Sequence, residues 1–303
     1  MLRRLPYLLV AIALVLAVSP SAAAAAPPWF SGQWLAAHPP ADPPAIKAAA
    51  AIVIDRDSQQ VMLAKEADQR RPPASMMKIV NAMVALDEAS PSDPITVSTH
   101  AAAMEPAVMG LAAGEVLTVQ DLLYGMLLDS GNDAAEALAD GLTGGREAYI
   151  ARMNAKAASL GLQNSQFVDP TGLSARNLTT PYEMAVLADA ALTAYPTIRQ
   201  IVRTKQVDIP ATAGHPAFAP TNLNDLLWTY QGTYGVKVGY TDAAELTITL
   251  AGERDGHNVL IVLMGSQDHF GDGRKLFDWA YAHIPAADGA QVRAFPTNLQ
   301  PGG

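Results

Sequence analysis

The sequence predicts an α/β fold of the α+β type, with one antiparallel sheet flanked by helices and a mostly helical subdomain. Short runs of apolar and β-branched residues occur early, at 51–65, and again late, at 234–265. Between them, apolar residues recur at helical spacing over several segments. Strands at both ends with helices between them favour a single sheet that helices cover, because each element must bury its apolar face.

The 303 residues, half of them hydrophobic, are enough for a well-buried core. The predicted segments are a signal peptide at 1–26, a proline-rich linker at 27–45, a folded domain at 46–285 and a disordered tail at 286–303. In the first segment, two arginines precede an apolar stretch from Leu8 to Val18 and a run of alanines, which is typical of a secretory signal. A membrane anchor needs about 20 apolar residues, so cleavage within 22–26 is favoured over a retained anchor.

The prolines of the linker are expected to prevent a regular helix and to make a stiff spacer. The tail carries no amphipathic stripe, so a C-terminal membrane helix is not expected. A membrane would be a partner only if the N-terminal segment is retained.

The first predicted elements are the hairpin strands Ala51–Asp55 and Val61–Lys65 and a helix at 76–86. Start and stop residues predict four further helices: 119–128 after Thr118, 132–142, 145–160 before Gly161, and Pro181 to about 193 after Thr180.

The last third of the chain changes to strand periodicity. Strands are predicted at 234–240, 246–252 and 259–265, and Asp255-Gly256 predicts a tight hairpin turn between the last two. A final helix is predicted at Arg274–His283.

Composition excludes several classes of function. The formal net charge is −9 and no cluster of Lys or Arg is present, so no nucleic acid is expected as a partner. The chain has no cysteine, which removes a thiol mechanism. Its six histidines form no H-E-x-x-H motif, so the sequence predicts no metal and no cofactor. The G-x-S-x-G motif of α/β-hydrolases is also absent.

Ser75 and Lys78 form the first motif that could carry chemistry. If Ser75 opens the predicted helix, Lys78 lies one turn further along the same face. A lysine in a dry cleft can lose enough proton affinity to activate a serine hydroxyl. For the motif taken alone, a serine cap beside a solvated lysine is the favoured alternative, because S-x-x-K is common.

Two further motifs lie later in the chain. Ser130 and Asn132 stand in a sharp turn between two predicted helices, and Lys237 lies on a predicted strand. Gly239 would let an extended ligand approach that strand closely. Each has an ordinary alternative when taken alone: Asn132 could cap a helix, and Lys237 could point to solvent.

The order and spacing of these motifs resemble the serine D-Ala-D-Ala carboxypeptidases, the low-molecular-mass penicillin-binding proteins of the DD-peptidase and β-lactamase-like superfamily. The resemblance covers nearly all of 50–283. Its segments are RRPPASMMK (70–78), MLLDSGNDAAEALA (126–139), MNAKAASLGLQNSQFVDPTGL (153–173), LTTPYEMAVLADAAL (178–192) and VKVGYTDAA (236–244). It implies a β-lactamase/transpeptidase-like fold and makes 46–285 a DD-peptidase catalytic domain.

The resemblance also implies roles for the matching residues of the first two motifs. Ser75 would be the acylated nucleophile and Lys78 its base. Ser130 would relay a proton toward the leaving amine, and Asn132 would bind the peptide backbone of the substrate.

The strand motif would complete the substrate site. Lys237 would add positive potential, and Gly239 and Tyr240 would form the substrate-binding strand. The backbone N–H groups of Ser75 and Tyr240 would form the oxyanion hole. The family usually has a hydroxyl residue between that lysine and glycine, but Val238 stands here.

This departure concerns the terminal carboxylate of the substrate, to which a Thr or Ser would donate a hydrogen bond. Many relatives also place an arginine before the final helix, where this chain has His269 or its neighbours, and Arg274 follows about one turn too late. Each missing bond would cost about 1–3 kcal/mol. The sequence therefore predicts reduced carboxypeptidase efficiency or a substrate without a free carboxylate, unless the backbone, Lys237 or Arg274 compensates.

The resulting prediction is an exported serine DD-peptidase, periplasmic, cell-wall associated or extracellular. It would hydrolyse the terminal D-Ala-D-Ala bond of peptidoglycan stem peptides through an acyl-enzyme, and β-lactams would be its inhibitors. Two alternatives stay open: a catalytically weak or non-catalytic module that binds cell wall or β-lactams, and a DD-endopeptidase. A class A β-lactamase is disfavoured, because Glu136, Glu147 and Glu183 all lie in predicted helices and none has Asn four residues later.

Overall fold

The computed structural model describes residues 30–142 and 144–284. The predicted signal peptide at 1–26 and tail at 286–303 lie outside the described residues, and the domain boundaries stay predictions. Within the described part, no helix is both long enough and apolar enough to span a bilayer.

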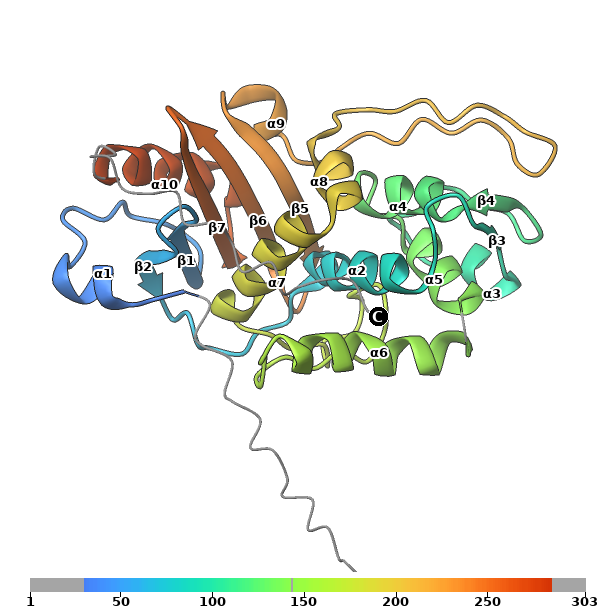
Figure 1. Cartoon of the computed structure of the whole chain (residues 1–303), viewed down its shortest axis with the longest axis horizontal. Coiled ribbons are helices and arrows are strands. Elements are labelled where there is room, and N and C mark those ends of the chain that lie inside the picture. Colours follow the sequence, from blue (N-terminus) through green and yellow to red (C-terminus); the bar gives the residue numbers. More distant parts are fainter. Residues whose placement is uncertain (1–29, 143, 285–303) are drawn as a thin grey trace, which may run out of the picture.

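A five-stranded antiparallel sheet in the order β2-β1-β7-β6-β5 forms the centre of the structure (Figure 1). Its strands are β1 (Ala50–Asp55), β2 (Gln60–Lys65), β5 (Thr233–Thr241), β6 (Glu245–Arg254) and β7 (His257–Ser266). The early hairpin joins the late strands through β1 and β7, which confirms the predicted single sheet. Asp255 and Gly256 both have positive φ, as a tight two-residue hairpin requires.

Helices cover both faces of this sheet. In β7, Leu260 and Val262 belong to one apolar cluster, while Ile261 and Leu263 belong to another. The helices α2 (Lys78–Glu88), α7 (Pro181–Ala194) and α8 (Pro196–Arg203) contribute to the first cluster, and α9 (Leu226–Thr229) and α10 (His269–His283) contribute to the second. Burial on both sides explains why the central strands read as continuous apolar runs.

A mostly helical subdomain follows α2, as predicted. It contains β3 (Pro94–Thr96), α3 (Thr99–Ala102), β4 (Val116–Thr118), α4 (Val119–Leu127), α5 (Asn132–Gly141) and α6 (Gly145–Ser159). Thr118 caps α4 in a reciprocal arrangement with Asp121, which confirms the predicted start of that helix. Thr180 likewise caps α7 by accepting a hydrogen bond from Glu183 N.

A long arm formed by 204–225 leaves α8 and projects past α4 before it returns to the sheet (Figure 1). Two antiparallel bridges join its limbs. Its tip is bound to β4, because Val116 N donates a 3.0 Å hydrogen bond to Gly214 O. Its base is bound to the turn before α5, because Thr221 N donates a 2.8 Å hydrogen bond to Asp129 Oδ1.

Two expectations about local structure are wrong. The proline-rich segment contains the short helix α1 (Gln33–Ala37), and Phe30 before it is buried in the core. A helix can form there because the prolines lie on either side of it and remove no donor within it. The last helix begins at His269 rather than Arg274, because Asp268 caps it by accepting a hydrogen bond from Gly271 N.

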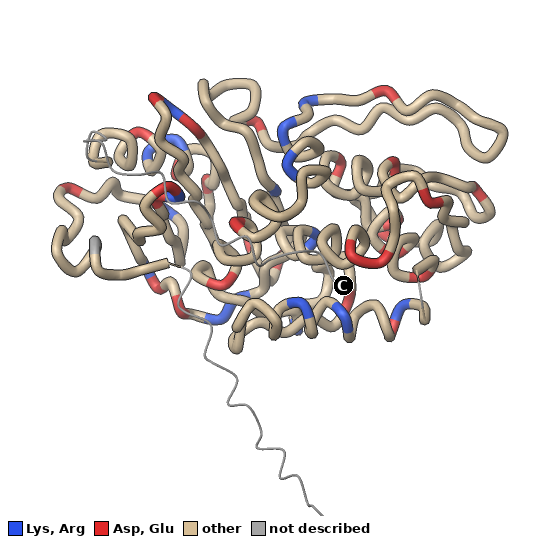
Figure 2. Tube along the Cα trace, in the orientation of Figure 1, with Lys and Arg blue, Asp and Glu red and all other residues tan. Residues whose placement is uncertain are grey.

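Figure 2 shows Lys and Arg interspersed with Asp and Glu over the described part, and no face in this view carries positive charge alone. A phosphate backbone laid across this side would meet carboxylates as well as cations.

Candidate active site

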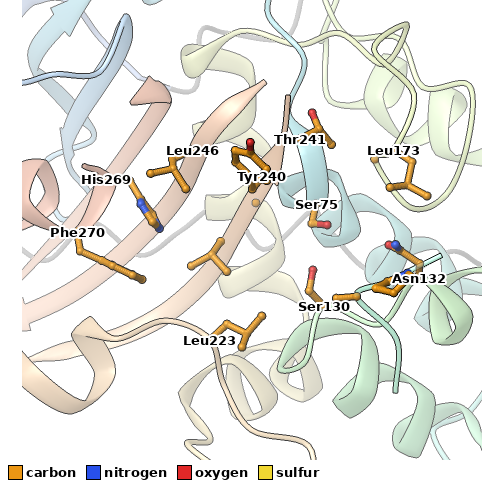
Figure 3. A pocket seen from close by; sticks show the side chains of 15 residues that line it. Ser75, Ser130, Asn132, Leu173, Leu223, Tyr240, Thr241, Leu246, His269 and Phe270 are labelled. Carbon is orange, nitrogen blue, oxygen red and sulfur yellow. The ribbon is translucent and has the colours of Figure 1, made fainter. Parts of the chain in front are cut away.

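A pocket of about 400 Å³ opens at the edge strand β5, where the sheet meets the helical subdomain (Figure 3). Its lining residues are Ser75, Pro106, Ala107, Ser130, Asn132, Gly172, Leu173, Leu223, Val238, Gly239, Tyr240, Thr241, Leu246, His269 and Phe270. The volume suits a small ligand or the end of a peptide. Five of the seven predicted site residues therefore line one pocket, and Lys78 and Lys237 are buried beside it.

Ser75 lies in the short 3-10 helix η1 (Ala74–Met77), which leads directly into α2. The neighbouring side chains of Met76 and Met77 are buried in the core, so Ser75 is the member of this turn that reaches the pocket. Thr247 Oγ1 of β6 donates a 3.1 Å hydrogen bond to Pro73 O and thereby ties the turn to the sheet.

Lys78 is fully buried and touches three oxygen atoms. Its Nζ lies 2.9 Å from Ser75 Oγ, 2.9 Å from Ser130 O and 2.6 Å from Asn132 Oδ1. Burial, and then the positive charge of Lys237, hold the pKa of the Lys78 ammonium well below its usual range. The alternative of a solvated lysine is wrong, and the geometry is that of a serine hydroxyl beside a base.

Ser130 and Asn132 occupy the turn between α4 and α5. Ser130 has a φ of 63°, a strained value for a non-glycine residue, and it lines the pocket. Asn132 is the first residue of α5, and Gly131 occupies the cap position without a side-chain bond. The Asn132 amide instead accepts from Lys78 and donates a 2.8 Å hydrogen bond to Glu105 O, so the capping alternative is wrong.

Lys237 is 1% exposed on β5 and donates a 3.0 Å hydrogen bond to Val238 O. Burial lowers the pKa of its ammonium to about 7, although Asp129 acts in the opposite direction. The alternative of a strand lysine in solvent is wrong. Near neutral pH, this residue supplies a titratable positive charge to the interior beside the pocket.

Gly239 is required for a reason that the sequence did not indicate. A Cβ atom at this position would lie 2.9 Å from Ser75 N and 2.6 Å from Thr247 Oγ1. On the other side of the same turn, a Cβ at Gly172 would overlap the carbonyl oxygen of Ala74. The backbones of β5 and of the 169–174 loop thus press directly against the turn that holds the serine.

Asp133 organises a pocket wall that the motif analysis missed. Its Oδ1 accepts a hydrogen bond from Met109 N at 2.8 Å, and its Oδ2 accepts from Gly110 N at 2.8 Å and from Leu111 N at 3.0 Å. These bonds hold the loop that brings Pro106 and Ala107 to the pocket. An acidic residue directly after a candidate ligand-binding asparagine was the available signal.

Asp169 organises a second wall in the same way. Its oxygens accept hydrogen bonds from Thr171, Gly172, Ser174 and Asn177. Burial opposes its charge, yet these bonds hold its pKa below the usual value. The D-P-T-G sequence favours such a turn, and it could have identified this residue from the sequence.

The other side of β5 carries the residues that depart from the family pattern. Val238, His269 and Phe270 all line the pocket, and the correspondence of His269 to the arginine of many relatives stays a prediction. Burial lowers the pKa of the His269 imidazole. Arg274 points elsewhere and donates a 3.0 Å hydrogen bond to Thr229 O of α9, so it does not compensate at the pocket.

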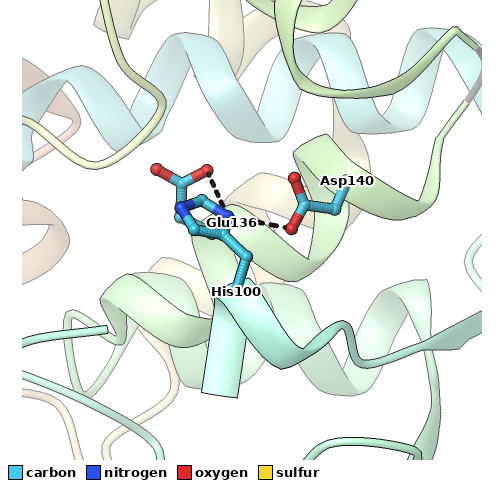
Figure 4. Close-up of side chains that lie close together, drawn as sticks. All are labelled: His100, Glu136 and Asp140. Atoms are coloured by element: carbon cyan, nitrogen blue, oxygen red, sulfur yellow. Dashed lines mark hydrogen bonds and ion pairs between the residues drawn. The ribbon is translucent and has the colours of Figure 1, made fainter. Parts of the chain in front are cut away.

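One group of potential metal ligands occurs in the described residues, away from the lining of the pocket: His100, Glu136 and Asp140 (Figure 4). Their ligand atoms lie within 4.8 Å of one another. Arg146 occupies both oxygens of Glu136, at 2.8 and 3.0 Å, and His100 Nδ1 lies 3.0 Å from Asp140 Oδ2. These partners give the cluster a structural role in joining α3 and α6 to α5.

Comparisons with known proteins agree with this geometry. The family model for D-alanyl-D-alanine carboxypeptidases matches residues 36–268. The D-alanyl-D-alanine carboxypeptidase DacB2 of Mycobacterium tuberculosis is 34% identical over 242 residues, which cover 77% of this chain and 82% of the relative.

A second relative and a solved structure are also similar along most of their length. A D-alanyl-D-alanine endopeptidase of Escherichia coli is 32% identical over 234 residues, or 74% of each chain. The crystal structure of a D-alanyl-D-alanine carboxypeptidase from Mycobacterium tuberculosis superposes with a TM-score of 0.75 at 34% identity, covering 80% of this chain and 94% of that one.

Proposed function

This chain belongs to the family of D-alanyl-D-alanine carboxypeptidases, which are serine peptidases, and on that premise we propose how its residues act. Ser75 Oγ attacks the carbonyl carbon between the last two D-Ala residues of a peptidoglycan stem peptide, and the acyl-enzyme is then hydrolysed. The observation that carries this proposal is the 2.9 Å distance between Ser75 Oγ and the Nζ of the fully buried Lys78.

The partners of Lys78 suit a base that changes protonation during the reaction. Ser130 O and Asn132 Oδ1 can only accept hydrogen bonds, so a neutral amine gives them its two protons. Its lone pair is then left for the hydroxyl proton of Ser75. After proton transfer, the third N–H points at Ser75 Oγ, and the ammonium remains fully hydrogen-bonded.

The remaining steps use groups that line the pocket. Ser130 passes a proton to the leaving amine, and Asn132 holds the peptide backbone of the substrate. The N–H groups of Ser75 and Tyr240 receive the oxyanion, where loss of one donor typically costs about 3–4 kcal/mol. The close approach of β5 at Gly239 to Ser75 N supports this placement.

Penicillins should acylate the same serine and leave it slowly. Among the described lining residues there is no Asp or Glu that could activate water for rapid deacylation. Glu136 is held by Arg146, and Glu183 accepts hydrogen bonds from Asn164 and Ser165. We therefore propose β-lactams as inhibitors rather than as substrates.

The location follows from the substrate. Peptidoglycan lies outside the cytoplasm, and the N-terminal 26 residues have the composition of a secretory signal. We propose that the protein is exported. Fractionation of cells that express the chain with and without residues 1–26 tests this, and an equal distribution of both forms would contradict it.

A fluorescent penicillin tests the nucleophile directly. The wild-type protein should become covalently labelled and should release D-Ala from a diacyl-Lys-D-Ala-D-Ala peptide, whereas Ser75→Ala should do neither. Mass spectrometry of the labelled tryptic peptide containing residues 72–78 locates the bond. Reversible binding of penicillin without a covalent adduct would support the alternative of a non-catalytic binding module.

A further inference from the structure

The pocket has two unlike halves, divided by strand β5 (Figure 3). Ser130 and Asn132 lie on one side of Ser75, next to the buried Lys78. On the other side, Figure 3 shows Leu246, His269 and Phe270 beyond β5. The first half holds the polar side chains of Ser75, Ser130 and Asn132 beside Leu173, whereas the labelled side chains beyond β5 are apolar except for His269.

The apolar half offers little to a carboxylate. Beside Val238 of β5, its lining residues are Leu246, His269 and Phe270. In the described part of the chain, no Lys or Arg lines the pocket at all. A carboxylate that enters such a place loses its water without gaining a charged partner, which strongly disfavours binding.

The cations nearby are engaged elsewhere. Lys237 Nζ donates to the backbone carbonyl of Val238. Arg274 is bound to Thr229 and lies 3.6 Å from the carboxylate of Asp225. Burial lowers the pKa of His269, so its imidazole is mostly neutral near pH 7.

The direction of the substrate decides which of its ends meets this half. Under the proposed function, Asn132 holds the backbone of the acyl part, which therefore lies in the polar half. The leaving group departs from the same carbonyl carbon on the opposite side of the attacked bond. Its amine then lies beside Ser130, which protonates it, and the group attached to that amine extends along β5 toward Val238 and the side chains beyond the strand.

We propose that this enzyme selects leaving groups without a free carboxylate, and that Val238 and His269 set this preference. The substrate class is a D-Ala-D-Ala peptide that ends in a carboxamide, or a D-Ala amide of a plain alkyl amine such as a cross-link through a lysine side chain. This inference rests on the proposed function, because it takes Ser75 as the nucleophile and Asn132 as the ligand of the acyl part.

A matched pair of substrates tests the inference. Diacetyl-Lys-D-Ala-D-Ala and its C-terminal amide differ only in the charge of the leaving group. The wild-type enzyme should give a kcat/KM for the amide equal to or above that for the acid. A value for the acid that is about tenfold higher would overturn the inference.

Substitutions at Val238 and His269 test whether these two residues set the substrate preference without altering catalysis itself. Val238→Thr adds a hydroxyl with almost no change in volume, and His269→Arg adds a permanent cation. Each should raise kcat/KM for the acid by about tenfold, which is the effect of one hydrogen bond to a charged group, and should leave the amide within about twofold. Val238→Ala is the control, because it opens space without a donor and should change neither value in favour of the acid.

The outcomes distinguish failure of the specificity inference from failure of the proposed function on which it rests. If the enzyme cleaves both substrates but prefers the acid, or if Val238→Ala matches Val238→Thr, the specificity inference fails and the proposed function stands. If neither substrate is cleaved and the amide forms no adduct at Ser75, the proposed function fails and the inference fails with it. Thermal unfolding of each variant verifies that the fold is retained.

Discussion

Lys78 and Lys237 are equally buried, at 0% and 1% exposure, yet their surroundings differ in one respect. Lys78 has three oxygen partners, from Ser75, Ser130 and Asn132. Lys237 donates to the backbone carbonyl of its own neighbour, Val238. Burial lowers the pKa of both ammonium groups, and the positive charge of Lys237 lowers the pKa of Lys78 further.

The difference indicates two uses for a buried amine. Lys78 is hydrogen-bonded in both protonation states, so it can accept and return a proton without rearrangement of its neighbours. Lys237 gains little from its single bond, so its burial is a cost that the fold retains for the electrostatic potential it provides. Four changes test this comparison, in order of decreasing effect.

The largest effect is expected from Lys78→Met. The variant should be acylated by penicillin about 10³-fold more slowly than wild type, because the base is removed while an apolar chain fills the space. Stopped-flow or gel-based labelling rates measure this. Acylation at the wild-type rate would show that another group takes the serine proton, and the proposed role of Lys78 would be lost.

Lys237→Met should lower activity but raise stability. The pKa of Lys237 falls from 10.5 in the unfolded chain to about 7 in the fold. As pH falls from 10.5 to 7, the unfolded chain binds a proton that the folded chain does not, so the free energy of unfolding decreases. Near pH 7, the variant should therefore be more stable than wild type by about 2–4 kcal/mol.

Thermal or urea unfolding at pH 7 and at pH 10 checks this sign. The advantage of Lys237→Met should shrink at pH 10, where the wild-type amine is less often protonated in the unfolded chain. A variant that is less stable than wild type at pH 7 would mean that the single bond to Val238 O outweighs the burial cost. The contrast between the two lysines would then disappear.

Asn132→Ala removes the shortest contact of Lys78. The free energy of unfolding should fall by about 1–3 kcal/mol, because Lys78 Nζ loses its 2.6 Å acceptor and Glu105 O loses its donor. Asn132→Asp is the matched control, since a carboxylate keeps the acceptor and should raise the pKa of Lys78. The acylation profile of the Asp variant should shift to higher pH, and identical behaviour of both variants would contradict the proposed network.

Asp129→Asn should have the smallest effect. The Asp129 carboxylate raises the pKa of Lys237, and an amide oxygen would still accept from Thr221 N. The variant should lose activity at slightly lower pH on the alkaline side, with kcat/KM about twofold lower near pH 7.5. An unchanged pH profile would indicate that the charge of Lys237 does not contribute to turnover.

Much of the molecule could be predicted from the sequence, because the residues that begin and end its helices and strands act on neighbours only a few positions away. The family, the fold class and the enzyme class are confirmed by the comparisons. Thr118, Thr180 and Asp255-Gly256 mark element ends through bonds or backbone angles within a few residues. The order and spacing of the three motifs predicted the family and the enzyme class.

What could not be predicted depends on contacts between distant segments. The approach of Gly239 to Ser75 N joins positions far apart in the chain, and no local pattern encodes it. Asp133 and Asp169 each have a signal in their own sequence neighbourhood, but that signal does not show that the loops they hold form two walls of one pocket. The helix α1 differs from the prediction because the prolines of 27–45 all lie outside 33–37 and leave that stretch able to form a helix.

The arm at 204–225 has a consequence for protein engineering. Exposed loop tips are usually the safest places for an inserted tag, but this tip is anchored to Val116 and its base is anchored to Asp129, one residue before Ser130. An insertion near Gly214 would pull on both anchors and would displace Ser130 from a distance. The Asp255-Gly256 turn, at the far end of a two-stranded hairpin, is the better site for a fluorophore or purification handle.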